Sequence, residues 1–198
     1  MTTSHTLPAI GRSVLRYRDY RLFLAARLLV TVAIQIKSVA VGYQVYELSH
    51  DQLALGFVGL AQFLPMLALI LPAGDLADRY NRRVIMVVSC ILEAAVAGGF
   101  LLITIFGVHS LGLFYAVLAL FGVVRTLSAP ASQSLVPLLV PSEQLSRAIA
   151  WSSSAFQTAT IAGPALGGVL YELGPKMAYG TCFVLSVIVV VLFGLIQA

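Results

Sequence analysis

Six long apolar stretches, separated by short polar connections, make up most of this chain. A transmembrane α-helix needs about 20 apolar residues, because each residue adds only about 1.5 Å along the helix axis. Backbone groups in lipid must form their hydrogen bonds within the segment, and the alternation typical of barrel strands is absent. We therefore predict six transmembrane helices, near residues 22–46, 53–76, 84–106, 111–135, 145–170 and 177–196.

The composition excludes a soluble globular protein. Hydrophobic residues make up 60% of the chain and charged residues only 10%, against about 25% charged residues in a typical soluble domain. A soluble fold of this length has too much surface to hide so many apolar side chains. Cys90 and Cys182 lie in apolar runs without a CxxC partner, so we predict two buried thiols, no disulfide and no metal site. The predicted fold class is all-α, polytopic and membrane-embedded.

Basic residues mark one side of the predicted bundle. Residues 1–21 form a basic N-terminal tail, and the second and fourth connections carry further arginines, whereas the other side has only Lys176. The positive-inside rule therefore places both termini in the cytoplasm of a protein integral to the plasma or inner membrane, and nucleic-acid binding is not expected. The tail fits either a short helix at the lipid headgroups or a disordered basic segment. The arginines on this side are Arg12, Arg16, Arg18, Arg21, Arg79, Arg82, Arg83 and Arg147.

The fifth predicted span is the most polar, with three serines, two threonines and a glutamine between residues 152 and 160. Such a helix is expected to pack inside a bundle or to line a water-filled cavity. Its small residues recur every four positions and form a smooth face that another helix can approach closely. Pro164 removes a backbone donor and predicts a kink. The small face consists of Ala155, Ala159, Gly163 and Gly167.

The connection at residues 74–83 is the strongest local motif. Asp78 lies among three arginines and is suited to charge-assisted hydrogen bonds, and Asn81 tolerates a left-handed turn. A positive-inside loop with incidental acids is the simpler interpretation, because that rule alone explains the arginines. The candidate gate residues are Gly74, Asp78, Arg79, Asn81, Arg82 and Arg83.

These motifs resemble those of the major facilitator superfamily. Gly74-x-x-x-Asp78-Arg79-x-x-Arg82-Arg83 resembles the signature between helices two and three, which forms a cytoplasmic gate in that family, with Asn81 in place of the usual glycine. Residues 159–168 are similar to the Gly-Pro-x-x-Gly-Gly motif of the superfamily's antiporters, with Ala159 in place of a further glycine. The residues that carry the antiporter resemblance are Ala159, Gly163, Pro164, Gly167 and Gly168.

Further residues resemble one branch of this superfamily. Arg125 resembles the arginine of the family's fourth helix, although Ser128 and Ala129 replace its usual Gln-Gly. Together with Phe63-Leu64-Pro65 and Leu139-Val140-Pro141, this is similar to the enterobactin-exporter-like branch, which includes multidrug efflux pumps. The match corresponds to the first six of twelve helices, and it implies alternating access against a second six-helix half or a second copy of this chain. The face around Gly163 is expected to meet that other half.

Lys37 lies in the first predicted span, Glu93 in the third and Arg125 in the fourth. Each costs at least about 2.5 kcal/mol near the bilayer centre unless it is paired or hydrated, so we expect all three to face inward. Two roles remain open. Glu93 or Arg125 takes part in proton coupling, or Glu93 forms a structural ion pair with Lys37 or Arg125.

Polar residues of the first and fifth spans are candidates for a substrate cavity, since apolar walls with a few polar groups suit an amphipathic molecule. Gln44 and Trp151 also fit positions at the two membrane interfaces. The candidates are Gln35, Gln44, Trp151, Ser154 and Thr158.

The resemblance implies a proton-driven exporter of a small amphipathic molecule, drug-like or siderophore-like, embedded in the lipid bilayer. No cofactor is expected, because the proton gradient is the energy source. The alternatives are a non-transporting membrane scaffold, a fragment of a transporter and a membrane-embedded enzyme. The enzyme is the weakest alternative, because the histidines lie in the tail and loops on different sides and the sequence has no HExxH motif or P-loop.

Overall fold

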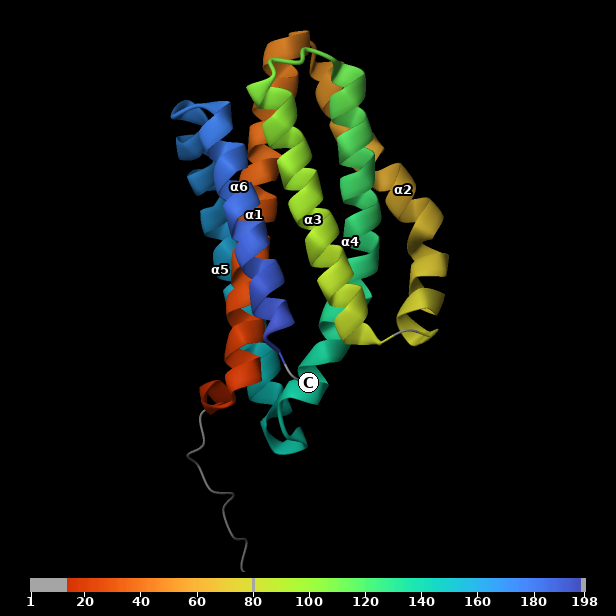
Figure 1. Cartoon of the computed structure of the whole chain (residues 1–198), viewed down its shortest axis with the longest axis vertical. Helices are drawn as coiled ribbons and strands as arrows, with labels where there is room; N and C mark the ends of the chain where they lie inside the picture. Colours follow the sequence, from red (N-terminus) through yellow and green to blue (C-terminus); the bar gives the residue numbers. More distant parts are fainter. Residues whose placement is uncertain (1–13, 80, 197–198) are drawn as a thin grey trace, which may run out of the picture.

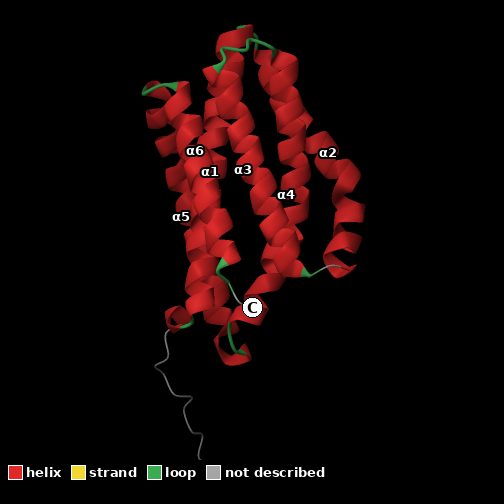
Figure 2. Cartoon of the chain, viewed as in Figure 1, coloured by secondary structure: helices red, strands yellow, loops and turns green. Residues whose placement is uncertain are grey.

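The computed structural model describes residues 14–79 and 81–196; within these ranges the side chains at 76–79, 82–83, 129–131 and 133–134 lie outside the description. The described part contains six long α-helices, arranged as a bundle in which consecutive helices run in opposite directions (Figures 1 and 2). The helices are α1 (Arg18–Ser49), α2 (Gln52–Arg79), α3 (Arg82–Ile105), α4 (Leu111–Leu139), α5 (Leu145–Glu172) and α6 (Pro175–Gly194). Short 3₁₀ helices, η1 (Val14–Arg16) and η2 (Ser142–Gln144), precede α1 and α5.

All six predicted helices are confirmed, and each is close to its expected position. Five of them, all but α5, are long and apolar enough to cross a membrane. The polar residues that distinguish the fifth span in the sequence explain why α5 falls short by composition. It nevertheless runs the length of the bundle beside α1 (Figure 1).

The chain alternates direction, so that the basic connections lie at one end of the bundle. α1, α3 and α5 begin at the lower end in Figure 1, where α2, α4 and α6 finish. The α2–α3 and α4–α5 connections, which carry the arginines, therefore share this end with the start of α1. We call it the basic end.

The turns at the other end follow local chemistry. His50 closes α1 in a left-handed conformation, with φ of 51°. Gly174, with φ of 128°, separates α5 from α6, and Pro175 starts α6 where its missing N–H needs no helical partner. Both turns fall at the connections predicted from the sequence.

The N-terminal boundary differs from the prediction. The sequence placed residues 1–21 in a tail, but α1 begins at Arg18, and Val14 and Tyr20 are buried. The Tyr20 hydroxyl donates a 2.7 Å hydrogen bond to the carbonyl of Ala148 near the start of α5. A buried tyrosine needs such a partner, and this contact draws the end of the predicted tail into the bundle. Residues 1–13, with Arg12, lie outside the described residues.

The bundle has two contiguous apolar clusters, one towards each end. At the basic end, Phe23 and Phe193 meet edge to face, with ring centroids 6.2 Å apart. At the opposite end, Phe100 stacks on Tyr179 at 5.5 Å. The two cysteines are free and buried, and Cys90 and Cys182 occupy one cluster each.

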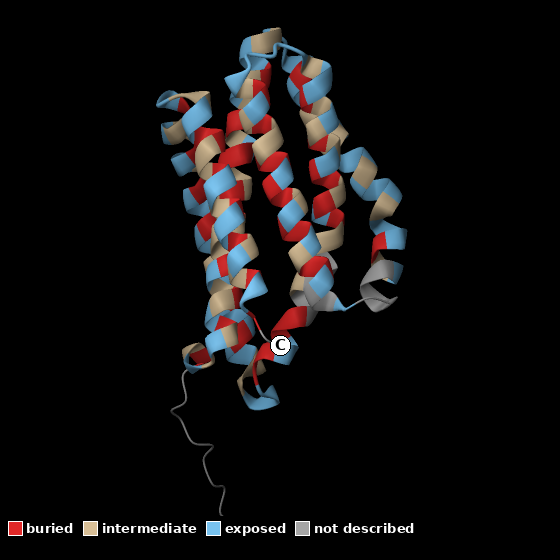
Figure 3. Cartoon of the chain, in the orientation of Figure 1, coloured by how far each residue is buried: buried red, intermediate tan, exposed pale blue. Residues whose placement is uncertain are grey.

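α2 is the peripheral helix. It packs mainly along α4 and leans away from the bundle towards the basic end (Figure 1). Figure 3 shows it largely exposed, whereas α1 and α3 carry buried residues along their length. Pro65 and Pro72 interrupt its backbone hydrogen bonding. The close contact with α4 is at Gly122, where an added Cβ would collide with the carbonyl oxygen of Gln62.

Candidate functional site

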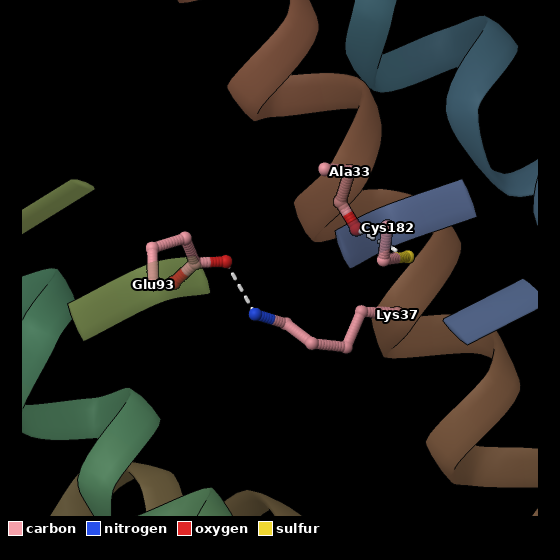
Figure 4. A network of polar contacts seen from close by, with 4 residues as sticks. All are labelled: Ala33, Lys37, Glu93 and Cys182. Atoms are coloured by element: carbon pink, nitrogen blue, oxygen red, sulfur yellow. Dashed lines mark hydrogen bonds and ion pairs between the residues drawn. The ribbon is translucent and has the colours of Figure 1, made fainter. Parts of the chain in front are cut away.

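A buried ion pair joins α1 to α3 near the middle of both helices. The Lys37 ammonium donates a hydrogen bond to Oε1 of Glu93 (Figure 4), and the two side chains are only 1% and 5% exposed. The ammonium also lies 3.8 Å from the centre of the Phe121 ring on α4. The negative face of an aromatic ring attracts a desolvated cation. Side chains of α1, α3 and α4 therefore meet at the Lys37 ammonium group.

The pair decides between the ionic partners considered in the sequence. Glu93 contacts Lys37, whereas the guanidinium carbon of Arg125 lies 5.7 Å from the centre of the Phe121 ring. Burial without a counter-ion costs several kcal/mol per charge. The contact therefore explains how two ionised groups are held at this depth, while the proton-coupling role stays a prediction.

A cavity of about 390 Å³ lies between the ion pair and the basic end. α1, α3, α4, α5 and α6 all contribute to its wall. Its apolar lining includes Val30, Ile34 and Phe156, and its hydroxyl groups come from Thr31, Ser89, Ser128 and Ser132. Small-molecule sites span about 300–1,000 Å³ and combine apolar walls with a few polar groups, as this one does.

Two arginines line the same cavity. Nη1 of Arg27 donates a 2.9 Å hydrogen bond to Ser132 Oγ, and its guanidinium lies 5.8 Å from the Phe156 ring centre. Arg125 is exposed and lies against Phe121. Glu93 is the only acidic residue among the described residues that line the cavity. The ring faces, rather than carboxylates, support both guanidinium groups.

The small face of α5 packs within this bundle, against the prediction that it meets another half. A Cβ added to Gly163 would lie 2.5 Å from Cβ of Gln35, and one added to Gly167 would lie 3.0 Å from Cα of Ile36. Ala159 is also buried. The prediction was wrong because the smooth face of α5 fits its own neighbour, α1, so closely that the two backbones nearly touch.

The comparisons with known proteins are consistent with this architecture. A family model described as transmembrane secretion effector matches residues 11–197. The chain belongs to this family of the major facilitator superfamily. Its helical bundle, with apolar helices of membrane-spanning length, is that of a multi-pass membrane protein.

The curated relatives of this chain include proteins named macrolide efflux protein A. The one from Streptococcus pyogenes is 30% identical over 140 residues, which are 70% of this chain and 34% of the relative. The one from Enterococcus faecalis is 33% identical over 121 residues, which are 60% of this chain and 35% of the relative. An uncharacterised MFS-type transporter of Bacillus subtilis, YhjO, is 30% identical over 107 residues, or 54% of this chain and 25% of its own length. The matched stretches thus cover about a third or less of each relative.

The five predicted cavity residues do not come together around the cavity of this transporter-family chain. Gln35 lies between α1 and α5, where its Nε2 donates a 3.2 Å hydrogen bond to the carbonyl of Thr160. Gln44 contacts Thr104 towards the end opposite the basic one and lines a different cavity. A groove between α1 and α5 is lined by Trp151, Ser154 and Thr158. The prediction of one shared cavity was wrong because shared polarity did not reveal which face of α1 or of α5 each residue occupies.

Only part of the predicted gate motif is described. The carbonyl of Asn81 accepts a 3.1 Å hydrogen bond from the Ile85 amide in the first turn of α3. Gly74 is partly buried in α2, and no atom lies within 4 Å of a Cβ placed there. The side chains of Asp78, Arg79, Arg82 and Arg83 lie outside the described residues, so the gate role stays a prediction.

Sequence reasoning missed Arg27, Ser89 and Phe156, which the structure places around the cavity. Arg27 was detectable, because it lies within the first predicted span and is subject to the same cost as Lys37. Ser89 and Phe156 carry no such signal. A serine or phenylalanine in an apolar run is ordinary, and only the packing shows which helix face turns inward.

Proposed function

We propose that this chain is one six-helix half of a secondary transporter that exports a small amphipathic molecule by alternating access. Its membership of a transmembrane secretion effector family, and the macrolide efflux proteins among its relatives, support an efflux role. Drug-like and siderophore-like substrates both suit a cavity with aromatic and hydroxyl-bearing walls. The enterobactin-exporter-like motifs favour neither class over the other.

The single observation that carries the mechanism is the buried Lys37–Glu93 pair, which lies at the end of the cavity farther from the basic end. Protonation of Glu93 removes the attraction between α1 and α3 and leaves the Lys37 ammonium buried without a counter-ion. Such an unpaired charge is strongly unfavourable. A conformation that gives Lys37 access to water is then favoured, so one proton biases the balance between the two access states.

A second six-helix half completes the proposed transporter. The matched stretch makes up only 34% of the Streptococcus relative, which supports a larger functional unit. Exposed polar residues of α5, such as Ser153 and Gln157, give that half a surface to contact. Rocking of one half against the other opens the cavity to each side in turn. By the positive-inside rule, the basic end with both termini lies in the cytoplasm.

Transport by everted membrane vesicles from cells that produce the chain tests this proposal. The probe is the neutral dye N-phenyl-1-naphthylamine, and nigericin removes the pH gradient. We expect gradient-dependent uptake that Glu93→Gln abolishes and Glu93→Asp, which keeps a titratable carboxylate, retains in part. Glu172→Gln removes an exposed acid at the end of α5 and is the matched control. Unchanged gradient-driven uptake by Glu93→Gln would contradict a role of Glu93 in proton coupling.

The need for a second half has its own test. The mass of the detergent-solubilised protein, measured before reconstitution, gives the number of chains in the transporting unit. A dimer, or a complex with another chain, is the expected active form. A monodisperse monomer that transports after reconstitution contradicts this part of the proposal.

A further inference from the structure

The cavity has more positive charge than the structure neutralises. Lys37 and Glu93 compensate each other. Arg27 and Arg125 also line the cavity, and neither forms an ion pair with a described residue. Arg27 is half-buried among largely apolar walls, so its charge attracts a counter-ion more strongly than it would in water, whereas Arg125 is exposed.

Two buried polar atoms of the cavity residues are also unsatisfied. Nε of Arg27 and Oγ of Ser89 are buried and have no hydrogen-bond partner among the described residues. Most buried polar atoms in proteins are hydrogen-bonded, so each orphaned atom calls for a partner. Nε of Arg27 can only donate, and the Ser89 hydroxyl can donate as well. Both atoms therefore suit an acceptor, which reaches them only after the side chains rotate, because both atoms are enclosed in this structure.

The position of the arginines defines where such an acceptor would lie. Arg27 comes from α1 and Arg125 from α4, on walls of the same cavity, and each guanidinium is placed against a phenylalanine ring. A guanidinium held against a ring keeps its N–H groups free for a carboxylate or sulfonate, which it can bind through two parallel hydrogen bonds. The Phe156 ring and the aliphatic wall leave room for an apolar body.

We infer that the cavity selects an anionic amphiphile: a molecule with a carboxylate, sulfonate or similar acidic group between Arg27 and Arg125 and an apolar body against Phe156. The inference rests on the proposed transport function and specifies the charge of its substrate.

Equilibrium binding of a matched pair of probes tests the inference on the full chain in nanodiscs. 8-Anilinonaphthalene-1-sulfonate and N-phenyl-1-naphthylamine share one aromatic skeleton, and only the first carries a sulfonate. We expect the sulfonate to bind more tightly, and Arg125→Gln or Arg27→Gln to weaken it about tenfold, the loss of roughly one charged hydrogen bond. Neutral dye binding is expected to change less than about twofold, because it makes no such bond.

Matched variants separate charge recognition from folding. Arg125→Lys keeps the positive charge but not the planar guanidinium, so it should bind the sulfonate more tightly than Arg125→Gln and less tightly than wild type. Arg147→Gln removes an exposed arginine outside the cavity lining and should change neither probe. Equal loss of both probes in Arg125→Gln would mean a damaged cavity. If Arg125→Lys also fails to restore the sulfonate, or if wild type prefers the neutral dye, the inference is overturned.

An anionic lipid headgroup has the same chemistry, so the bilayer is varied as well. Nanodiscs of phosphatidylcholine alone are compared with nanodiscs that also contain phosphatidylglycerol. Arginine-dependent sulfonate binding that is unaffected by phosphatidylglycerol supports a small-molecule site. Loss of that binding assigns the arginines to a lipid and overturns the inference. Because these are binding measurements, they are independent of transport. Arginine-dependent binding without transport would contradict the proposed function but would still support the anion site.

Discussion

Gly163 of α5 lies directly against Gln35 of α1, so that a β-carbon at Gly163 would be only 2.5 Å from that of Gln35. The amide of Gln35 reaches past this contact to the carbonyl of Thr160 one turn away. The absence of a side chain at residue 163 thus sets the distance between the two helices, and the polar side chain of α1 holds them in register.

Gly163→Ala should destabilise the bundle. The added methyl group has no space and forces the helices apart, and overpacking of this kind costs about 1–3 kcal/mol. Thermal unfolding of the detergent-solubilised protein, followed by circular dichroism, measures the change. Gly168→Ala is the control on the same helix, because nothing lies within 4 Å of its Cβ position; its expected effect is neutral or stabilising by about 0.5–1 kcal/mol. Equal effects of the two substitutions would contradict the close contact.

The Lys37–Glu93 pair should behave as a unit in stability measurements. Lys37→Met or Glu93→Leu alone leaves one charge buried and should lower the free energy of unfolding by about 3–5 kcal/mol, whereas the double variant should recover most of that loss. Denaturant titration in lipid-containing micelles tests this cycle. Glu172→Gln, at an exposed acid, should change little. Additive losses in the double variant would show that the two residues do not depend on each other.

The two native cysteines offer a test of the cavity without any substitution. Cys90 lines the cavity, whereas Cys182 is fully buried on α6 and its Sγ contacts the carbonyl of Ala33 (Figure 4). A small water-soluble methanethiosulfonate should therefore modify Cys90 faster, on the order of tenfold, because thiol reactivity depends on access. Mass spectrometry of digested protein gives both rates. Faster modification of Cys182 would exclude a solvent path along this cavity.

The orientation of the bundle can be measured at its two ends. With both native cysteines replaced by alanine, Ser142→Cys places a thiol in the exposed η2 turn at the basic end, and Ser110→Cys places one in an exposed connection at the other end. An impermeant maleimide applied to intact cells should label residue 110 but reach residue 142 only after lysis. The reverse pattern would place the basic end outside the cell.

The number and positions of the helices could be predicted because membrane insertion imposes a simple rule on sequence. An apolar run of sufficient length must satisfy its backbone internally, and it does so as a helix. Helix ends were less predictable: α1 and α2 extend beyond their apolar runs, because polar residues can continue a helix past the region that hydropathy detects.

The site was predictable only where burial imposes a large energetic cost. Lys37 and Glu93 were identified as inward-facing because a lone charge in the membrane is so unfavourable. The pairing of Glu93 with Lys37 rather than with Arg125 depends on how α1, α3 and α4 are rotated about their axes. Apolarity on nearly all sides of a membrane helix hides that rotation, and this is why Gln35 and Trp151 were assigned to a shared cavity that they do not line.

The polarity of α5 has a consequence for biogenesis. The other five helices have the length and hydropathy of membrane spans, but α5 is more polar, and its glycine face fits closely against α1. We expect α5 to leave the translocon only when α1 is already in the membrane to receive it. Glycosylation mapping of α5 inserted with and without α1 would measure this dependence, and efficient insertion of α5 alone would refute it. The order of synthesis, with α1 first, is then part of how the bundle assembles.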